Sequence, residues 1–152
     1  MTWTFLFAPR RSPMERHVLV PLDGSEAAWG ALEHALDRHR GHRITALHVV
    51  NPLEGDFDLD ASEAEPEKRS EKIFQEAKAL YEQTVSPDDK TLFETAVETG
   101  RPAQTIVEYA TENDVDQIVM GSRGRSGLSR VLLGSVAETV VRRADVPVTV
   151  VR

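Results

Sequence analysis

Short apolar runs alternate with amphipathic stretches along this chain. The first run, His17–Leu22, is rich in β-branched residues and ends in Asp-Gly-Ser, which predicts a buried strand followed by a turn. From Glu26 onward the apolar residues recur at helical spacing, and Gly41 ends the predicted helix. Ser25 precedes this helix and is suited to cap it.

The same alternation continues to the C-terminus. Further strands are predicted over Arg43–Val50, Thr91–Glu98, Asp116–Met120 and Pro147–Val151. Further helices are predicted over Lys68–Thr84, from Pro102 to Asn113, and over Ser135–Arg143. Because the strands are continuous apolar runs that alternate with helices, the pattern predicts an α/β protein with an open, doubly wound parallel sheet.

Two segments lie outside this pattern. The apolar stretch within residues 1–13 is too short for the core of a signal peptide. The basic pair follows this stretch, whereas in a signal peptide the positive charge precedes the apolar core. We interpret them as a disordered extension, or an over-extended start, before one domain of residues 14–152; a docking or membrane-touching tail is the alternative. Glu54–Glu67 is acidic and poor in apolar residues, which predicts a mobile loop. Its alternating aspartates resemble a calcium loop, but the glycine and the closing glutamate are missing at the required offsets, so a solvated loop is favoured.

Composition narrows the classes of function. The net charge of −7 argues against general binding to nucleic acid or to anionic membranes. No apolar run is long enough for a transmembrane helix. The chain has no cysteine, which excludes disulfides, thiolate catalysis and cysteine-ligated metals. That absence also fits a reducing compartment, and we expect a cytoplasmic protein.

The most informative chemistry follows the fourth predicted strand, at the edge where open parallel sheets bind ligands. Gly121 and Gly124 lie three residues apart, and nine residues separate them from Gly134 and Ser135. Small residues let the backbone approach a phosphate, and the start of the next helix offers N–H groups and a positive dipole end. Arg123 would add charge. The alternatives are a mobile connection and a plain serine cap. The spacing fits neither a Walker loop nor a dinucleotide fingerprint.

Two other residues carry open alternatives. Asp23 follows the first strand and is either a turn residue or a nucleotide contact. His48 lies within the second strand, where a satisfied buried histidine is favoured over a catalytic one.

Three stretches carry a resemblance to a known family. They are HVLVPLDGSEAA from His17, LHVVNP from Leu47, and IVMGSRGRSGLSRVLLGSVAETVVRRADVPVTVV from Ile118. Together with the spacing G-x2-G-x9-G-S/T, they make Arg16–Arg152 resemble the universal stress proteins, on the branch that binds ATP.

The resemblance implies a five-stranded parallel sheet of order 3-2-1-4-5, of the adenine nucleotide alpha hydrolase-like type. It implies ATP or another adenine nucleotide, with Mg²⁺ or Mn²⁺ bridging the phosphates. Asp23 would lie near the ribose or adenine, with Pro21 as a wall of the base pocket and Val49 against the adenine. The residues implied around the phosphates are Met120, Gly121, Arg123, Gly124, Gly134, Ser135 and Val136.

The resulting expectation is a nucleotide-dependent regulatory dimer in a stress response. Pairing of Val146–Val151 with the same strand of a second copy would cover an exposed sheet edge, and a lone edge guarded by Pro147 and Arg152 is the alternative. A slow ATPase and an interaction module with an empty pocket are rival functions. We assign no catalytic residue, because the sequence offers no clear general base.

Overall fold

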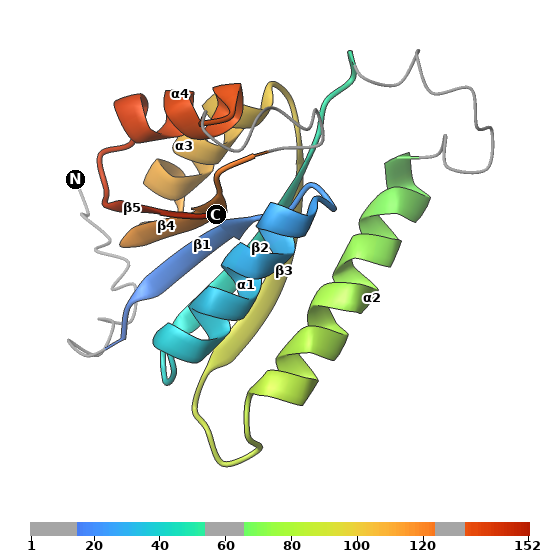
Figure 1. The fold of residues 1–152 in the computed structure, drawn as a ribbon, viewed down its shortest axis with the longest axis vertical. Coiled ribbons are helices and arrows are strands. Elements are labelled where there is room, and N and C mark those ends of the chain that lie inside the picture. Colours follow the sequence, from blue (N-terminus) through green and yellow to red (C-terminus); the bar gives the residue numbers. More distant parts are fainter. Residues whose placement is uncertain (1–14, 54–65, 124–132) are drawn as a thin grey trace, which may run out of the picture.

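A single five-stranded parallel sheet forms the centre of the molecule (Figure 1). The computed structural model describes residues 15–53, 66–123 and 133–152. Its strand order is β3-β2-β1-β4-β5, which confirms the order that the family resemblance implied. The strands are β1 (His17–Pro21), β2 (Arg43–Val50), β3 (Leu92–Thr99), β4 (Gln117–Gly121) and β5 (Val148–Val151).

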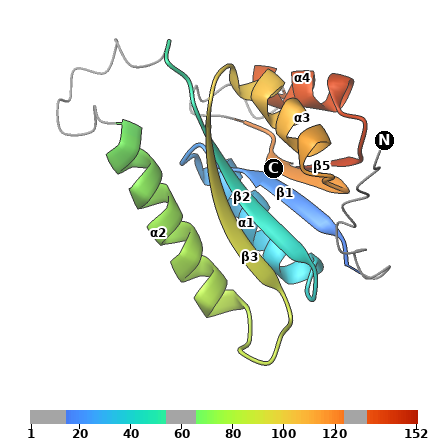
Figure 2. The same cartoon turned by 180° about the vertical axis from the view of Figure 1, so that it is seen from behind.

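Helices cover both faces of the sheet, as the alternating pattern predicts. The helices of the described residues are α1 (Glu26–Arg38), α2 (Pro66–Thr84), α3 (Pro102–Glu112) and α4 (Ser135–Arg143). Figure 1 shows α1 and α2 on one face, and Figure 2 shows α3 and α4 on the opposite face. In the described part of the chain, no helix is long and apolar enough to cross a membrane.

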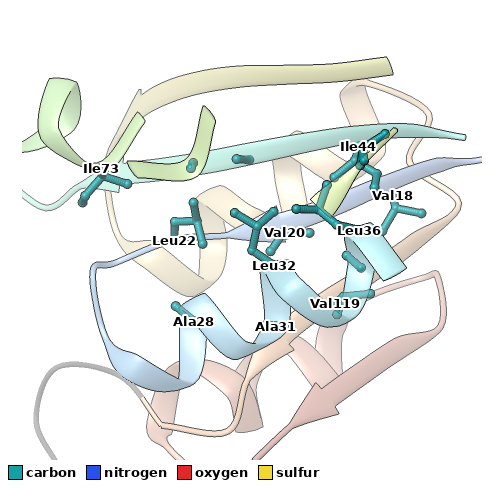
Figure 3. Close-up of a cluster of buried hydrophobic side chains, with 14 residues drawn as sticks. Val18, Val20, Leu22, Ala28, Ala31, Leu32, Leu36, Ile44, Ile73 and Val119 are labelled. Carbon is teal, nitrogen blue, oxygen red and sulfur yellow. The ribbon is translucent and has the colours of Figure 1, made fainter. Parts of the chain in front are cut away.

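The core has two halves because successive strand residues point to opposite faces. On the face of α1 and α2, Val18 and Val20 pack with Leu32 and Leu36 (Figure 3). On the face of α3 and α4, Leu19 belongs to a second cluster with Ile118. The central strand β1 is therefore buried on both sides, which explains its continuous apolar sequence.

Most predicted boundaries agree with the structure within two residues. β2 and α4 have the predicted bounds, and Ser25 caps α1 by accepting a hydrogen bond from the Ala28 N–H. The first helix ends at Arg38, before the predicted stop at Gly41, where the backbone has already turned to a φ of +76°. The second helix starts at Pro66, two residues before the predicted start, because proline is well accommodated in a first turn.

The strand β3 is the outer strand on one side, and it is less buried than its apolar sequence suggests. Phe93 packs on the core and stacks on Tyr81 with ring centroids 5.0 Å apart. Leu92 and Val97, by contrast, are 53% and 51% exposed. The apolar positions of an edge strand therefore do not all reach the core.

Candidate functional site

The candidate site residues lie where the parallel strands end. In the sheet the strand order reverses between β1 and β4. The helix that follows β1 packs on one face, and the helix that follows β4 packs on the other (Figure 2). The two connections therefore diverge at the carboxyl edge between β1 and β4, which is where open α/β sheets bind ligands.

The connection after β1 forms a tight turn. The Ser25 N–H donates to Asp23 Oδ1 at 2.9 Å, and Gly24 between them has a φ of +83°, a left-handed value that favours glycine. Ser25 Oγ accepts from the Ala28 N–H at 3.2 Å and donates to the Arg123 carbonyl oxygen at 3.4 Å. The turn orients the Asp23 carboxylate and links α1 to the segment after β4.

The backbone of Val49 faces the space beyond the end of β1. Every second residue of β2 directs its backbone N–H and C=O toward β1. The last hydrogen bond of this ladder runs from the Leu22 N–H to the Leu47 carbonyl oxygen at 2.8 Å. The next pairing would join Val49 to the Leu22 carbonyl and the Gly24 N–H. Within the described residues neither of these hydrogen bonds is formed. The N–H and C=O of Val49 therefore point together toward the site.

The His48 side chain is hydrogen-bonded to the Leu22 carbonyl oxygen, the acceptor that the Val49 N–H would use if the ladder continued. Its imidazole is 6% exposed, and its Nδ1 lies 2.8 Å from the Leu22 carbonyl oxygen. Because a carbonyl can only accept, Nδ1 carries the proton and donates it to this bond. The prediction of a satisfied buried histidine is confirmed.

The end of β4 lies directly against α1. A Cβ atom added to Gly121 would lie 2.6 Å from the carbonyl carbon of Ala27 and 2.8 Å from its Cβ. Gly121 is therefore required by the packing of α1 on the sheet, a role that its place in the glycine motif does not reveal.

The two described ends of the Gly-rich connection meet across the end of β5. The Ser122 N–H donates to the Val151 carbonyl oxygen at 2.8 Å, and the Gly134 N–H donates to the Ser122 carbonyl oxygen at 2.6 Å. Gly134 is the N-cap residue of α4 and Ser135 is the first residue of the helix, so the interpretation of Ser135 as a cap is wrong. The two described ends of the Gly-rich connection are thus held together by backbone hydrogen bonds.

The start of α4 presents backbone donors at the carboxyl edge of the sheet. The first hydrogen bond of this helix runs from the Glu138 N–H to the Gly134 carbonyl oxygen at 2.9 Å. The N–H groups of Ser135, Val136 and Ala137 therefore have no acceptor inside the helix. Ser135 is exposed, and these donors stand at the positive end of the helix dipole. Such an arrangement favours an anion.

The structure brings the described candidate residues to one edge of the sheet. Pro21, Asp23, Val49 and Arg123 are half-buried, so each keeps accessible surface. Met120 is 5% exposed and packs in the core of the α3 and α4 face. The remaining candidate, Gly124, lies outside the described residues, as do Arg125 and Arg130.

Three other histidines, His17, His39 and His42, lie away from the candidate site. His17 is buried, and its ring nitrogens lie 2.7 Å from Thr45 Oγ1 and 3.1 Å from the Asn113 carbonyl oxygen. His39 and His42 lie near each other at the opposite end of the sheet from the site, with ring centroids 6.4 Å apart. Over the described ranges, no group of three histidine or carboxylate side chains could hold a metal ion.

The sheet order, the two helix layers and the glycine-bounded edge define an α/β protein of the type that binds ligands at a topological switch point. The model of the universal stress protein family matches residues 14–152, so the chain belongs to the universal stress protein family. The universal stress protein MJ0531 of Methanocaldococcus jannaschii is 35% identical over 146 residues, which cover 90% of this chain and 82% of that protein.

Solved structures agree with this assignment. The structure of MJ0577, from the same organism, has a TM-score of 0.71 and 29% identity, and the match covers 91% of this chain and 96% of that one. A universal stress protein in complex with cAMP has a TM-score of 0.68 and 24% identity, over 90% of this chain and 97% of that one. At that identity the second likeness shows the shared fold alone.

Proposed function

We propose that this universal stress protein binds an adenine nucleotide, with ATP as its main ligand, at the carboxyl edge between β1 and β4. The observation that carries the proposal is the backbone of Val49, whose N–H and C=O have no partner in β1 among the described residues and which lies on the same sheet edge as the anion-favouring start of α4. One end of this edge suits a base and the other suits phosphates.

The base end selects adenine by its hydrogen-bonding pattern. Val49 offers one backbone donor and one backbone acceptor side by side. The Watson–Crick edge of adenine carries an acceptor at N1 and a donor at N6, which complement this pair. Guanine carries a donor at N1 and an acceptor at O6, so the same backbone would meet it with like groups opposed. A mismatch of this kind leaves buried polar groups unpaired and discriminates strongly between ligands.

The sugar lies between the base and the phosphates in this proposal. Asp23 Oδ1 is engaged by the Ser25 N–H, which holds the carboxylate in one orientation at the end of β1. Its oxygens accept from the ribose hydroxyls, and Pro21 forms a wall beside the base.

The phosphates bind at the start of α4. Ser135 and Val136 supply backbone N–H groups, Gly134 has no side chain to hinder the approach of a phosphate, and the Ser135 side chain is exposed toward solvent at this helix end. Arg123 supplies a positive charge from the segment after β4. Mg²⁺ or Mn²⁺ would bridge phosphate oxygens and neutralise part of their charge. This fits a site built from backbone donors and one arginine.

The action of the protein is regulatory in this proposal. Occupancy by the nucleotide alters what the protein binds, and the chain works as a dimer paired through β5. β5 is an edge strand whose C-terminal carbonyl at Val151 already holds Ser122 at the phosphate end. The proposed nucleotide site and the proposed dimer surface are therefore adjacent.

Analysis of ligand released from the purified protein tests the function. We expect adenine nucleotide by chromatography and mass spectrometry, and ATP binding with magnesium by calorimetry. Gly134→Ala should weaken ATP binding, because its φ of −61° and ψ of 155° suit alanine, while an added Cβ would hinder the close approach of a phosphate. Absence of any adenine-nucleotide binding would refute the proposal, and steady release of ADP over many turnovers would favour an ATPase instead.

A further inference from the structure

We propose that His48 is the positioning residue that keeps the base-reading backbone of Val49 open. This inference rests on the proposed function, because it explains how the adenine end of that site is kept available. His48 does not touch the nucleotide in this proposal; it acts through the Leu22 carbonyl oxygen.

The register of the sheet shows what His48 prevents. The β1–β2 ladder runs from His17 paired with Arg43 to Pro21 paired with Leu47, and the Leu22 N–H adds one more bond to the Leu47 carbonyl oxygen. One further step would place the Val49 N–H on the Leu22 carbonyl. That carbonyl instead accepts from His48 Nδ1 at 2.8 Å.

Two donors on adjacent residues lie near the Leu22 carbonyl oxygen, and among the described residues it accepts from the His48 imidazole and not from the Val49 N–H. The His48 side chain points to the α1 and α2 face, where it is buried beside the Leu22 end of β1, while its own backbone pairs with β3. The Val49 backbone points in the plane of the sheet toward β1. When the imidazole takes the carbonyl, β1 turns away at Asp23 and the Val49 N–H is left for a ligand acceptor. A donor side chain immediately before Val49 is therefore a device that ends the ladder at the base site.

Two substitutions separate this role from simple packing. His48→Asn keeps a donor, because the asparagine Nδ2 is as many bonds from Cα as the histidine Nδ1. His48→Leu fills a similar space without a donor, and it frees the Leu22 carbonyl for the Val49 N–H. His17→Leu is the matched control, since His17 is also buried and hydrogen-bonded but stands at the other end of β1.

Amide hydrogen exchange on ligand-free, ¹⁵N-labelled protein gives the direct readout. In the wild type, the Val49 amide should exchange at least about tenfold faster than the Leu47 amide, which is paired with β1. In His48→Leu, Val49 should become protected, and in His48→Asn it should stay fast. A wild-type Val49 amide as protected as that of Leu47 would overturn the inference, and this measurement needs no variant to fold.

Calorimetry with two ligands gives the functional readout. His48→Leu should lower the affinity for ATP with magnesium roughly tenfold, the effect of about one hydrogen bond, and leave inorganic tripolyphosphate unaffected. His48→Asn and His17→Leu should keep the wild-type ratio of the two affinities. An equal loss for both ligands in His48→Leu would overturn the role. If the wild type binds no adenine nucleotide, the proposed function fails, while the exchange measurement still decides the role of His48.

Discussion

Gly121 and Ala27 are in direct backbone contact, so the first turn of α1 lies on the last residue of β4. A Cβ on Gly121 would stand 2.6 Å from the Ala27 carbonyl carbon and 2.8 Å from the Ala27 carbonyl oxygen. Backbone atoms cannot rotate out of the way, so any side chain here must move the helix. The first glycine of the motif thus has a role in the fold that does not depend on any ligand.

Gly121→Ala should therefore destabilise the protein even when no nucleotide is present. We expect a loss of about 1–3 kcal/mol in the free energy of unfolding, the usual cost of overpacking a tight contact. Urea unfolding of the ligand-free protein measures it.

Gly30→Ala is the matched control for that experiment. Gly30 lies inside α1, and among the described residues an added Cβ would meet only Val151 Cγ1 at 3.9 Å, an ordinary contact. Alanine in a helix interior is favoured over glycine, so this variant should gain roughly 0.5–1 kcal/mol. Equal effects of the two substitutions would contradict the contact described for Gly121.

Ser25 should contribute to stability through the cap of α1. Ser25→Ala removes the acceptor of the Ala28 N–H and should cost about 1 kcal/mol of unfolding free energy. Ser25→Asp keeps an acceptor for the helix but has no hydroxyl to donate to the Arg123 carbonyl oxygen. Thermal unfolding should therefore rank aspartate close to serine and alanine below both. A Ser25→Ala variant as stable as the wild type would show that the cap is unimportant.

The fold could be read from the sequence because its cues are local. β2 ends at an Asn-Pro break and α4 begins after a glycine, and both were predicted with the observed bounds. The sequence predicts the start of α2 two residues late, because Pro66 and Glu67 continue an acidic stretch, and only the fold shows them to be helical. The exposure of Leu92 and Val97 depends on which strand is outermost, and residue types do not state that.

The site could be predicted only as far as residue identities and their spacing indicate it. The spacing of Gly121, Gly134 and Ser135 predicts the phosphate end of the proposed site. The open backbone of Val49 follows from the register of the sheet and, in our proposal, from the His48 contact with Leu22, and neither can be read from residue identity. The signal available in advance was the buried histidine itself, whose partner the sequence could not name.

Stability should fall as the solution becomes mildly acidic because of His39. Burial, followed by the charges of His42, His34 and Arg16, lowers the pKa of His39 from its ordinary value of 6.5. The unfolded chain therefore binds a proton at a pH where the folded protein does not, and protonation favours unfolding. The stability contributed by neutral His39 is present above pH 6.5 and is lost as the pH falls from there through the lowered value.

Urea unfolding from pH 8 to about pH 5.5 measures this effect. His39→Gln has no titrating group at this position, so its stability should decline less steeply than that of the wild type. Both proteins carry the other histidines, so their contributions to the pH dependence of stability largely cancel when the two proteins are compared over the same pH range. Parallel declines for the two proteins would contradict an effect of His39.

The outer edge of β5 should control dimer formation if the chain pairs there. The Ile118 N–H donates to the Pro147 carbonyl oxygen at 3.0 Å, and the Ser122 N–H donates to that of Val151. Pro147 and Val151 therefore direct their backbone carbonyls toward β4. Val150 alternates with them, so its N–H points away from the sheet. Val150→Pro removes that donor without breaking a bond to β4, because proline is tolerated on an edge strand. We expect light scattering to show a monomer for Val150→Pro and a dimer for the wild type.

Val150→Ala separates backbone pairing from side-chain packing at the same position. It keeps the outward N–H, so strand pairing between two copies remains available and the variant should stay dimeric at micromolar concentration. Circular dichroism and unfolding of Val150→Pro show whether the monomer keeps its fold, because every β4–β5 hydrogen bond is retained. A dimer that persists in a folded Val150→Pro protein would place the contact on another surface, and the exposed strand β3, with Leu92 and Val97, would be the next surface to test.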